Sequence, residues 1–213
     1  MKYKKIFVIG FNKTASTTLH NLFGQLGYKS QHNGKSWDLD KYDCLSDNGD
    51  LQNLKTLYNV PDSLFILNTR NLNDWLISRS KHCAWHNKYE PKSKFSWGWP
   101  PCSDIYIKWI KERENHFKKV MKLFQKDKER LLVVSINRTD WIRFVANNIG
   151  HNYTNNIASN QINIEDLNKE DIDLINQELN KCYAKLKYKD WQKKIEFLGD
   201  NSILESYANN MKI

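Results

Sequence analysis

Apolar runs and amphipathic segments alternate along this chain. Three runs, at 6–9, 63–69 and 130–136, are almost continuously apolar, which predicts buried strands. A shorter run at 28–32 is a candidate for a further strand. The segment 33–50 is polar and has no clear periodicity, so an irregular connection is expected there.

Helical spacing of apolar residues follows the predicted strands. One stripe consists of Leu19, Leu22, Phe23 and Leu26, and Gly27 is placed to end that helix. Asn71 is a suitable N-cap for a second helix, with Asp74 three residues further on. The remaining helices are predicted at 51–58, about 104–126, 141–149, about 164–186 and 190–198.

An aromatic segment at 88–101 contains prolines and is predicted to be a long loop. A lid or a substrate-facing role fits such a loop. Trp85, Trp97 and Trp99 could stack on a sugar or an aromatic ligand, although packing of the loop explains these side chains equally well.

Strands that alternate with helices predict an α/β fold. Continuous apolar strands indicate a parallel sheet covered on both faces, which makes a three-layer sandwich with a central sheet flanked by helices. At 213 residues the chain fits a single domain over 1–213, with a mainly helical C-terminal part from about residue 152.

Composition narrows the class of ligand. A hydrophobic fraction of 40% and an aromatic fraction of 13% are typical of a globular protein. The net charge of +9 suits an anionic ligand, but the lysines are scattered over predicted helix surfaces. Because no nucleic-acid-binding module is recognisable, no specific nucleic-acid partner is expected.

Features of targeting and metal binding are not recognisable in the sequence. No segment resembles a signal peptide or a membrane span, and the four cysteines are widely separated, so a cytoplasmic protein with reduced thiols is expected. His82, Cys83 and His86 lie close together, but no second pair of ligands follows at useful spacing. We therefore expect no metal.

A candidate anion site follows the first predicted strand. Gly10 ends the strand, and a short polar turn leads through Lys13 to the hydroxyl residues at the start of a helix. Backbone N–H groups, the helix dipole and the lysine charge would all face a phosphate. A Walker A loop needs four residues between its glycines, and Gly10 precedes Lys13 by only three positions, so the loop is too short for a triphosphate. An ordinary turn is the alternative.

A second anion-binding junction follows the strand at 63–69. Arg70 stands at the end of that strand, and Ser78 lies about two helical turns further on. Ligands of parallel sheets bind beyond the carboxyl ends of the strands, so both junctions are expected along one edge. Two such sites suit a ligand with phosphates at two ends.

The two junctions resemble motifs of the sulfotransferases that use 3′-phosphoadenosine 5′-phosphosulfate (PAPS). The run 11–18 resembles the 5′-phosphosulfate loop, and Arg70 to Asp74 followed by Ser78 looks like the 3′-phosphate motif. Weaker similarity at 42–47, 130–136 and 141–150 extends the resemblance over roughly the first two-thirds of the chain. This family has a P-loop NTPase-like fold. The sequence departs from the pattern at Ala15, where the family usually has glycine, at Asn71-Leu72, and in lacking the basic glycine-containing loop.

The resemblance implies a role for each matched residue. PAPS would be the co-substrate, without a metal, and the acceptor would be a hydroxyl or amine of a small molecule or glycan. Lys13 would hold the bridging oxygen, Arg70 and Ser78 the 3′-phosphate, and Asp47 would be the general base. Asp43, Asp50 and His32 remain candidates for that base. The cofactor-binding residues would be Asn12, Lys13, Thr14, Ala15, Ser16, Thr17, Thr18, Arg70 and Ser78.

Two other functions remain open. A small P-loop kinase is disfavoured by the short loop and by the lack of a clear magnesium-binding carboxylate at a strand end. A protein that binds the nucleotide without catalysis stays possible because of Ala15 and the uncertain base. His20, His116 and His151 are expected on the surface. The sequence identifies neither the acceptor nor the oligomeric state.

Overall fold

The computed structural model describes residues 3–34, 38–47, 51–93, 96–153, 167–186 and 205. The chain divides into two compact units, which are described separately. The sheet unit comprises Met1–Arg70, Lys118–Asn160 and Asn201–Ile213, and the helical unit comprises Asn71–Phe117 and Gln161–Asp200. The single domain over 1–213 therefore stays a prediction.

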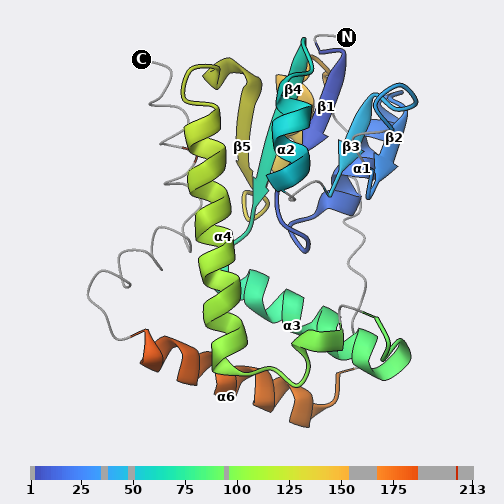
Figure 1. Ribbon diagram of the computed structural model, residues 1–213. Coiled ribbons are helices and arrows are strands. Elements are labelled where there is room, and N and C mark those ends of the chain that lie inside the picture. Colours follow the sequence, from blue (N-terminus) through green and yellow to red (C-terminus); the bar gives the residue numbers. More distant parts are fainter. Residues whose placement is uncertain are drawn as a thin grey trace. The chain divides into compact units, whose positions relative to one another are not determined.

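A five-stranded sheet forms the centre of the sheet unit (Figure 1). All its strands are parallel, in the order β2-β3-β1-β4-β5. The strands are β1 (Lys5–Val8), β2 (Ser30–His32), β3 (Cys44–Ser46), β4 (Ser63–Thr69) and β5 (Leu131–Ser135). The predicted α/β fold with a parallel sheet is confirmed, and so are the strands predicted within 6–9, 28–32, 63–69 and 130–136.

One strand contradicts the sequence analysis. The segment 33–50 was predicted to be irregular, but Cys44–Ser46 forms β3, which pairs with β1 on one side and β2 on the other. All three residues of β3 are buried. A strand this short carries no readable alternation, and its stability comes from pairing on both edges.

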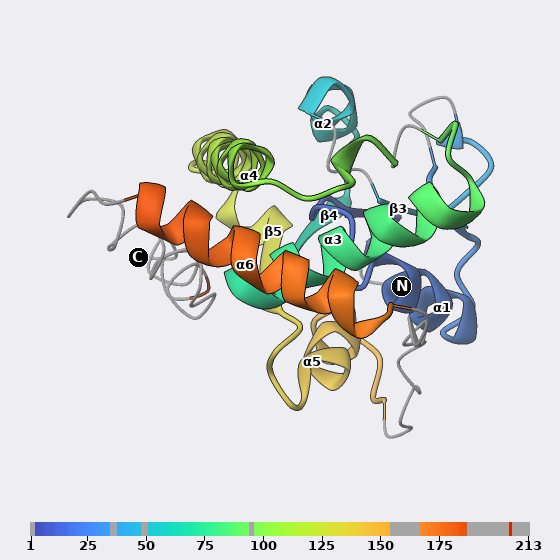
Figure 2. The ribbon, with the colours of Figure 1, turned by 90° about the horizontal axis from the view of Figure 1, so that it is seen from below.

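Helices cover both faces of this sheet. α1 (Ser16–Gln25) and α5 (Trp141–Asn148) pack on one face, where Leu19 and Val145 join the buried strand residues Ile6, Val8 and Ile66 in one apolar cluster. Figure 2 shows these two helices on one side of the sheet and α2 (Leu51–Tyr58) on the other.

An aromatic cluster fills the second face. The centroid of the Phe65 ring lies 5.1 Å from that of Phe7 and 4.8 Å from that of Phe124. The ring centroids of Tyr58 and Phe124 are 5.3 Å apart. Phe124 directly follows α4 (Ser103–Leu123). Each aromatic ring removes a large apolar area from water, so this cluster and the opposite face together make the core of the sheet unit.

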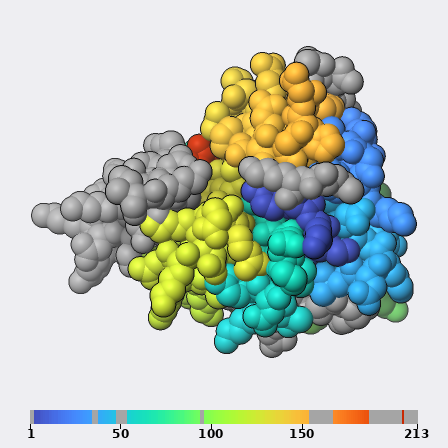
Figure 3. Space-filling view, turned by 90° about the horizontal axis from the view of Figure 1, so that it is seen from above, coloured from blue at the N-terminus to red at the C-terminus, as the bar shows by residue number. Residues whose placement is uncertain are grey.

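Arg130 stabilises the segment that leads into β4, at the amino ends of the strands. It ends the short 3-10 helix η3 (Lys128–Arg130), and its guanidinium donates to the backbone oxygens of Tyr58 and Val60 at 2.9 Å and to Ser63 Oγ at 2.7 Å. A cavity of about 630 Å³ opens beside it, lined by Tyr3, Lys4 and Asp62 among others. Figure 3 looks onto this end of the sheet, which is opposite to the edge where the anion site was predicted.

The helical unit contains α3 (Leu72–Tyr89), the 3-10 helix η2 (Ser96–Gly98), most of α4, and α6 (Lys169–Lys185). Asn71 caps α3 as predicted, because its side chain accepts from the Asn73 N–H. Two guanidinium groups contact the buried Trp75 ring, those of Arg79 at 5.3 Å and Arg113 at 5.1 Å from its centroid. Burial lowers the pKa of Arg113 to about 9.

Two sequence-based expectations for this unit need correction. The loop predicted over 88–101 is shorter, since α3 continues to Tyr89 and η2 occupies Ser96–Gly98. His116 was expected on the surface but is only 1% exposed, because its position on α4 faces the interior. The helix predicted at 190–198 and residues 164–166 of the helix predicted at about 164–186 lie outside the described residues. In the described part of the chain, no helix has the length and apolar character that crossing a membrane requires.

Candidate functional site

The polar loop predicted as an anion site lies at the carboxyl end of β1 and leads directly into α1. β1 is the middle strand of the sheet, with β3 and β4 as its neighbours. Residues that follow β3 and β4 therefore flank the loop from two sides. Within the loop Lys13 and Ala15 have left-handed backbones, with φ of 65° and 66°. That conformation costs about 1 kcal/mol for each non-glycine residue.

Asn68 connects the two ends of this loop. It is completely buried in β4, and its Oδ1 accepts from the Gly10 N–H at 3.0 Å. Its Nδ2 donates to the backbone oxygen of Thr14 and to Thr14 Oγ1, the latter at 2.8 Å. Thr14 Oγ1 in turn donates to the backbone oxygen of Phe11. One carboxamide thus fixes the beginning and the end of the turn.

Gly10 is required where the loop meets β4. A Cβ at this position would lie 2.2 Å from the backbone oxygen of Asn68 and 2.3 Å from Asn68 Oδ1. No side chain fits at such distances. The glycine that ends the first strand in the sequence therefore allows the loop to approach β4 closely.

Arg70, the first residue of the second predicted motif, contacts the loop that forms the first motif. It follows β4, and its Nη1 donates to the backbone oxygen of Lys13 over 3.4 Å. The two residues are 57 positions apart in the sequence. A guanidinium and a lysine-bearing loop at one edge make this part of the sheet unit a suitable place for an anion.

The first residues of α1 contact the ends of β2 and β3. His32 Nε2 lies 3.2 Å from both Ser16 Oγ and Thr17 Oγ, and His32 is the last residue of β2. Asp47, which follows β3 with a φ of 66°, accepts from Ser16 Oγ at 3.3 Å through Oδ1. The hydroxyl groups that would meet an anion are thus held by one imidazole and one carboxylate.

His20 lies one helical turn further along α1. Its ring is 6.1 Å from the His32 ring, and its Nδ1 lies 2.9 Å from Ser30 Oγ. Partial burial, and then the nearby His32, lower the pKa of His20. The expectation of a surface position is only partly met, because the side chain is half-buried.

Most of the predicted site residues lie in the sheet unit, near the carboxyl ends of its strands. The loop and the start of α1 contain Asn12, Lys13, Thr14, Ala15, Ser16, Thr17 and Thr18. Arg70 and Asp47 contact them, as described above. Ser78 belongs to the helical unit, where it is half-buried on α3.

The alternative bases differ in their surroundings. Asp43 Oδ2 accepts from the Lys29 N–H at 3.0 Å and so supports the start of the β2 segment. His32 lies at the loop, whereas Asp50 lies outside the described residues. Asn68 was not identified from the sequence. The available signal was a polar side chain near the end of an otherwise apolar strand.

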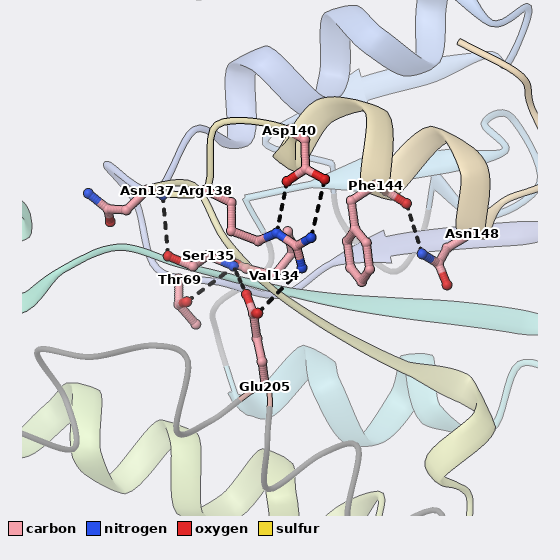
Figure 4. Close-up of polar contacts among 9 residues, drawn as sticks. All are labelled: Thr69, Val134, Ser135, Asn137, Arg138, Asp140, Phe144, Asn148 and Glu205. Atoms are coloured by element: carbon pink, nitrogen blue, oxygen red, sulfur yellow. Dashed lines mark hydrogen bonds and ion pairs between the residues drawn. The ribbon is translucent and has the colours of Figure 1, made fainter.

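The carboxyl end of β5 carries a separate polar network (Figure 4). Glu205 accepts from the Ser135 N–H at 2.6 Å and lies 3.6 Å from Arg138 Nη1. Arg138 also pairs with Asp140 at 3.0 Å and stacks over the Phe144 ring at 4.3 Å. This network joins Glu205 to the residues that end and follow β5.

Other predicted features lie in the helical unit. Trp97 is 80% exposed, while Trp85 and Trp99 are half-buried. The rings of His82 and His86 are 4.4 Å apart, and His86 Nδ1 pairs with Glu90 at 2.9 Å. Within the described ranges, no group of three or more His, Cys, Asp and Glu side chains could hold a metal ion.

Comparisons of this chain with protein-family models, with curated proteins and with solved structures found no match. A functional proposal therefore rests on the site residues, their geometry and the motifs that they form.

Proposed function

We propose that this chain is a sulfotransferase that moves a sulfuryl group from PAPS to a hydroxyl or amine of a small molecule or a glycan. The observation that carries the proposal is the contact between Arg70 Nη1 and the Lys13 backbone oxygen, because it brings the arginine of the second predicted motif to the lysine-bearing loop of the first. The parallel sheet with helices on both faces is consistent with a three-layer, P-loop NTPase-like sandwich.

The donor would bind through both motifs. The helix dipole and the hydroxyls of Ser16 and Thr17 would hold the 5′-phosphate at the start of α1. Arg70 would bind the 3′-phosphate through its planar guanidinium. With both phosphates fixed, the sulfuryl group would have one position in front of the loop.

Transfer is an in-line displacement at sulfur. The acceptor oxygen or nitrogen forms a bond to sulfur, and the bond from sulfur to the bridging phosphate oxygen breaks. The electron pair of the broken bond stays on the phosphate, where the Lys13 ammonium stabilises it. The acceptor proton goes to Asp47, which lies beside the α1 N-terminus. The products are the sulfated acceptor and adenosine 3′,5′-bisphosphate.

Isothermal titration calorimetry of adenosine 3′,5′-bisphosphate, followed by transfer from ³⁵S-labelled PAPS to a panel of acceptors, tests the proposal. Lys13→Ala should abolish turnover. Lys4→Ala is the matched control, because Lys4 pairs with Asp62 at the opposite edge and its loss changes the net charge equally. Near-normal turnover in Lys13→Ala would refute the mechanism. Tight bisphosphate binding without transfer to any acceptor would support a nucleotide-binding protein without catalysis.

One observation favours a second candidate, a small P-loop kinase. A kinase was disfavoured from the sequence because no carboxylate was evident at a strand end. In the structure Asp47 follows β3, and its Oδ1 lies 3.3 Å from Ser16 Oγ. A carboxylate and a hydroxyl at the start of a helix could bind Mg²⁺ together with phosphate oxygens. The same calorimetry with ATP–Mg²⁺ separates the two candidates, since a kinase should bind ATP–Mg²⁺ more tightly than the bisphosphate.

A further inference from the structure

We infer that Asn68 is a positioning residue that orients the backbone of the loop toward the bound anion. This inference deepens the proposed function and rests on it for the identity of the ligand. The starting observation is that Asn68, at 0% exposure, makes hydrogen bonds to both ends of the loop. A buried carboxamide with its acceptor and its donors engaged is held in one orientation.

The hydrogen bond to Thr14 fixes one peptide plane. In a trans peptide the carbonyl oxygen and the following N–H point in opposite directions. Because Asn68 Nδ2 holds the Thr14 oxygen on the β4 side, the Ala15 N–H points away from β4. This peptide leads into the first residues of α1, whose N–H groups have no partners within the helix.

Arg70 fixes the preceding peptide, between Lys13 and Thr14, by a hydrogen bond to its carbonyl oxygen. It donates to the Lys13 oxygen, so the Thr14 N–H points away from the guanidinium of Arg70, the residue that follows β4. Two consecutive N–H groups that point to one side make a concave site for an anion. Side chains at the end of β4 therefore set the backbone that would face the phosphate.

The same contacts explain how Ala15 occupies a left-handed position. Glycine adopts φ near 66° without a penalty, but alanine does not. Asn68 offsets this penalty by holding the carbonyl that precedes Ala15. The positions 68 and 15 should therefore be energetically coupled, and a glycine at position 15 should reduce the need for Asn68.

A double-mutant cycle on the full chain tests this coupling. The variants are Asn68→Ala, Ala15→Gly and the double variant, each titrated calorimetrically with adenosine 3′,5′-bisphosphate. Asn68→Ala should weaken binding about tenfold, because the loop loses the side chain that orients its backbone. Ala15→Gly alone should change affinity less than about threefold, and in the double variant it should restore most of the lost affinity.

Controls separate positioning from general destabilisation. Asn148→Ala removes a carboxamide bond to the Phe144 oxygen on α5, remote from the loop, and should leave the affinity unchanged. If Asn68→Ala does not fold, Asn68→Ser keeps a polar group at the site and is tested in the same cycle. Additive effects of the substitutions at 68 and 15 would overturn the inference.

A second readout makes the inference independent of the ligand. Hydrogen exchange of the amides at 12–17, measured without ligand, should be faster in Asn68→Ala than in Asn148→Ala, and slower again when Ala15→Gly is added. Unchanged exchange in Asn68→Ala would overturn the inference. Absence of bisphosphate binding by the wild-type protein would refute the proposed function instead, while the exchange experiment would still test the role of Asn68.

Discussion

Replacing Gly10 with alanine adds a methyl group where the structure has no space. The added Cβ would lie 2.2 and 2.3 Å from two oxygens of Asn68, and Cβ atoms essentially never approach another heavy atom closer than 3.0 Å. Either β1 and β4 separate locally or the Asn68 side chain and backbone shift. Overpacking of this kind costs about 1–3 kcal/mol.

The displaced carboxamide adds a second cost. Movement of Asn68 breaks its bonds to the Gly10 N–H and to Thr14, and each buried hydrogen bond contributes about 1 kcal/mol. We therefore expect Gly10→Ala to lower the free energy of unfolding by about 3–5 kcal/mol. For a chain of this size that corresponds to a fall in Tm of roughly 10 °C.

Gly24→Ala is a matched control within the following helix. No heavy atom lies within 4 Å of a Cβ at Gly24, which is exposed on α1. Alanine favours the helix over glycine, so this variant should gain about 0.5–1 kcal/mol. Urea denaturation followed by circular dichroism measures both variants. A Gly10→Ala protein within about 0.5 kcal/mol of wild type would refute the close-approach reasoning.

Three further predictions concern stability and pH. Arg130→Met should lower the free energy of unfolding by about 2–3 kcal/mol in urea denaturation, because it leaves the backbone oxygens of Tyr58 and Val60 without this donor; a loss below about 0.5 kcal/mol would contradict this. Because the pKa of His20 is lowered in the folded protein, the unfolded chain binds a proton at this residue first as the pH falls. The free energy of unfolding should therefore decrease as the pH drops below the ordinary pKa of 6.5. His20→Gln should flatten this slope in urea denaturation series from pH 5 to 8. An equal slope in both proteins would exclude His20 as its source. If Asp47 is the general base, Asp47→Asn should lower kcat about a hundredfold. An unchanged rate and an unchanged pH–rate profile would remove Asp47 from that role.

The sequence was most informative where the local pattern and the tertiary environment agree. The buried strands at 6–9 and 63–69 and the cap at Asn71 follow from apolar runs and from side-chain chemistry, and all three are confirmed. β3 could not be predicted, because three residues give no period and the strand depends on neighbours on both sides. The expectation that His116 is exposed was wrong for a related reason, since its burial is decided by packing around α4.

The candidate site was predictable only in part. Lys13 and Arg70 belong to recognisable motifs, so their approach at one edge followed from the parallel topology. Asn68 belongs to no motif, and its role depends on an atomic fit with Gly10 that a linear pattern does not contain. The pairing of His32 with Ser16 likewise depends on the order of β2 and β3 in the sheet.

The hydrogen bond from Gly10 to Asn68 spans 58 positions, and this separation has a consequence for how the loop is acquired during folding. A fragment that contains only β1, the loop and α1 lacks the carboxamide that holds Thr14, so it should not retain the loop conformation. The loop forms only when β4 has paired with β1. A ligand that binds the formed loop therefore stabilises the β1–β4 pairing by mass action, and slower hydrogen exchange in the middle of the sheet should accompany binding at its edge.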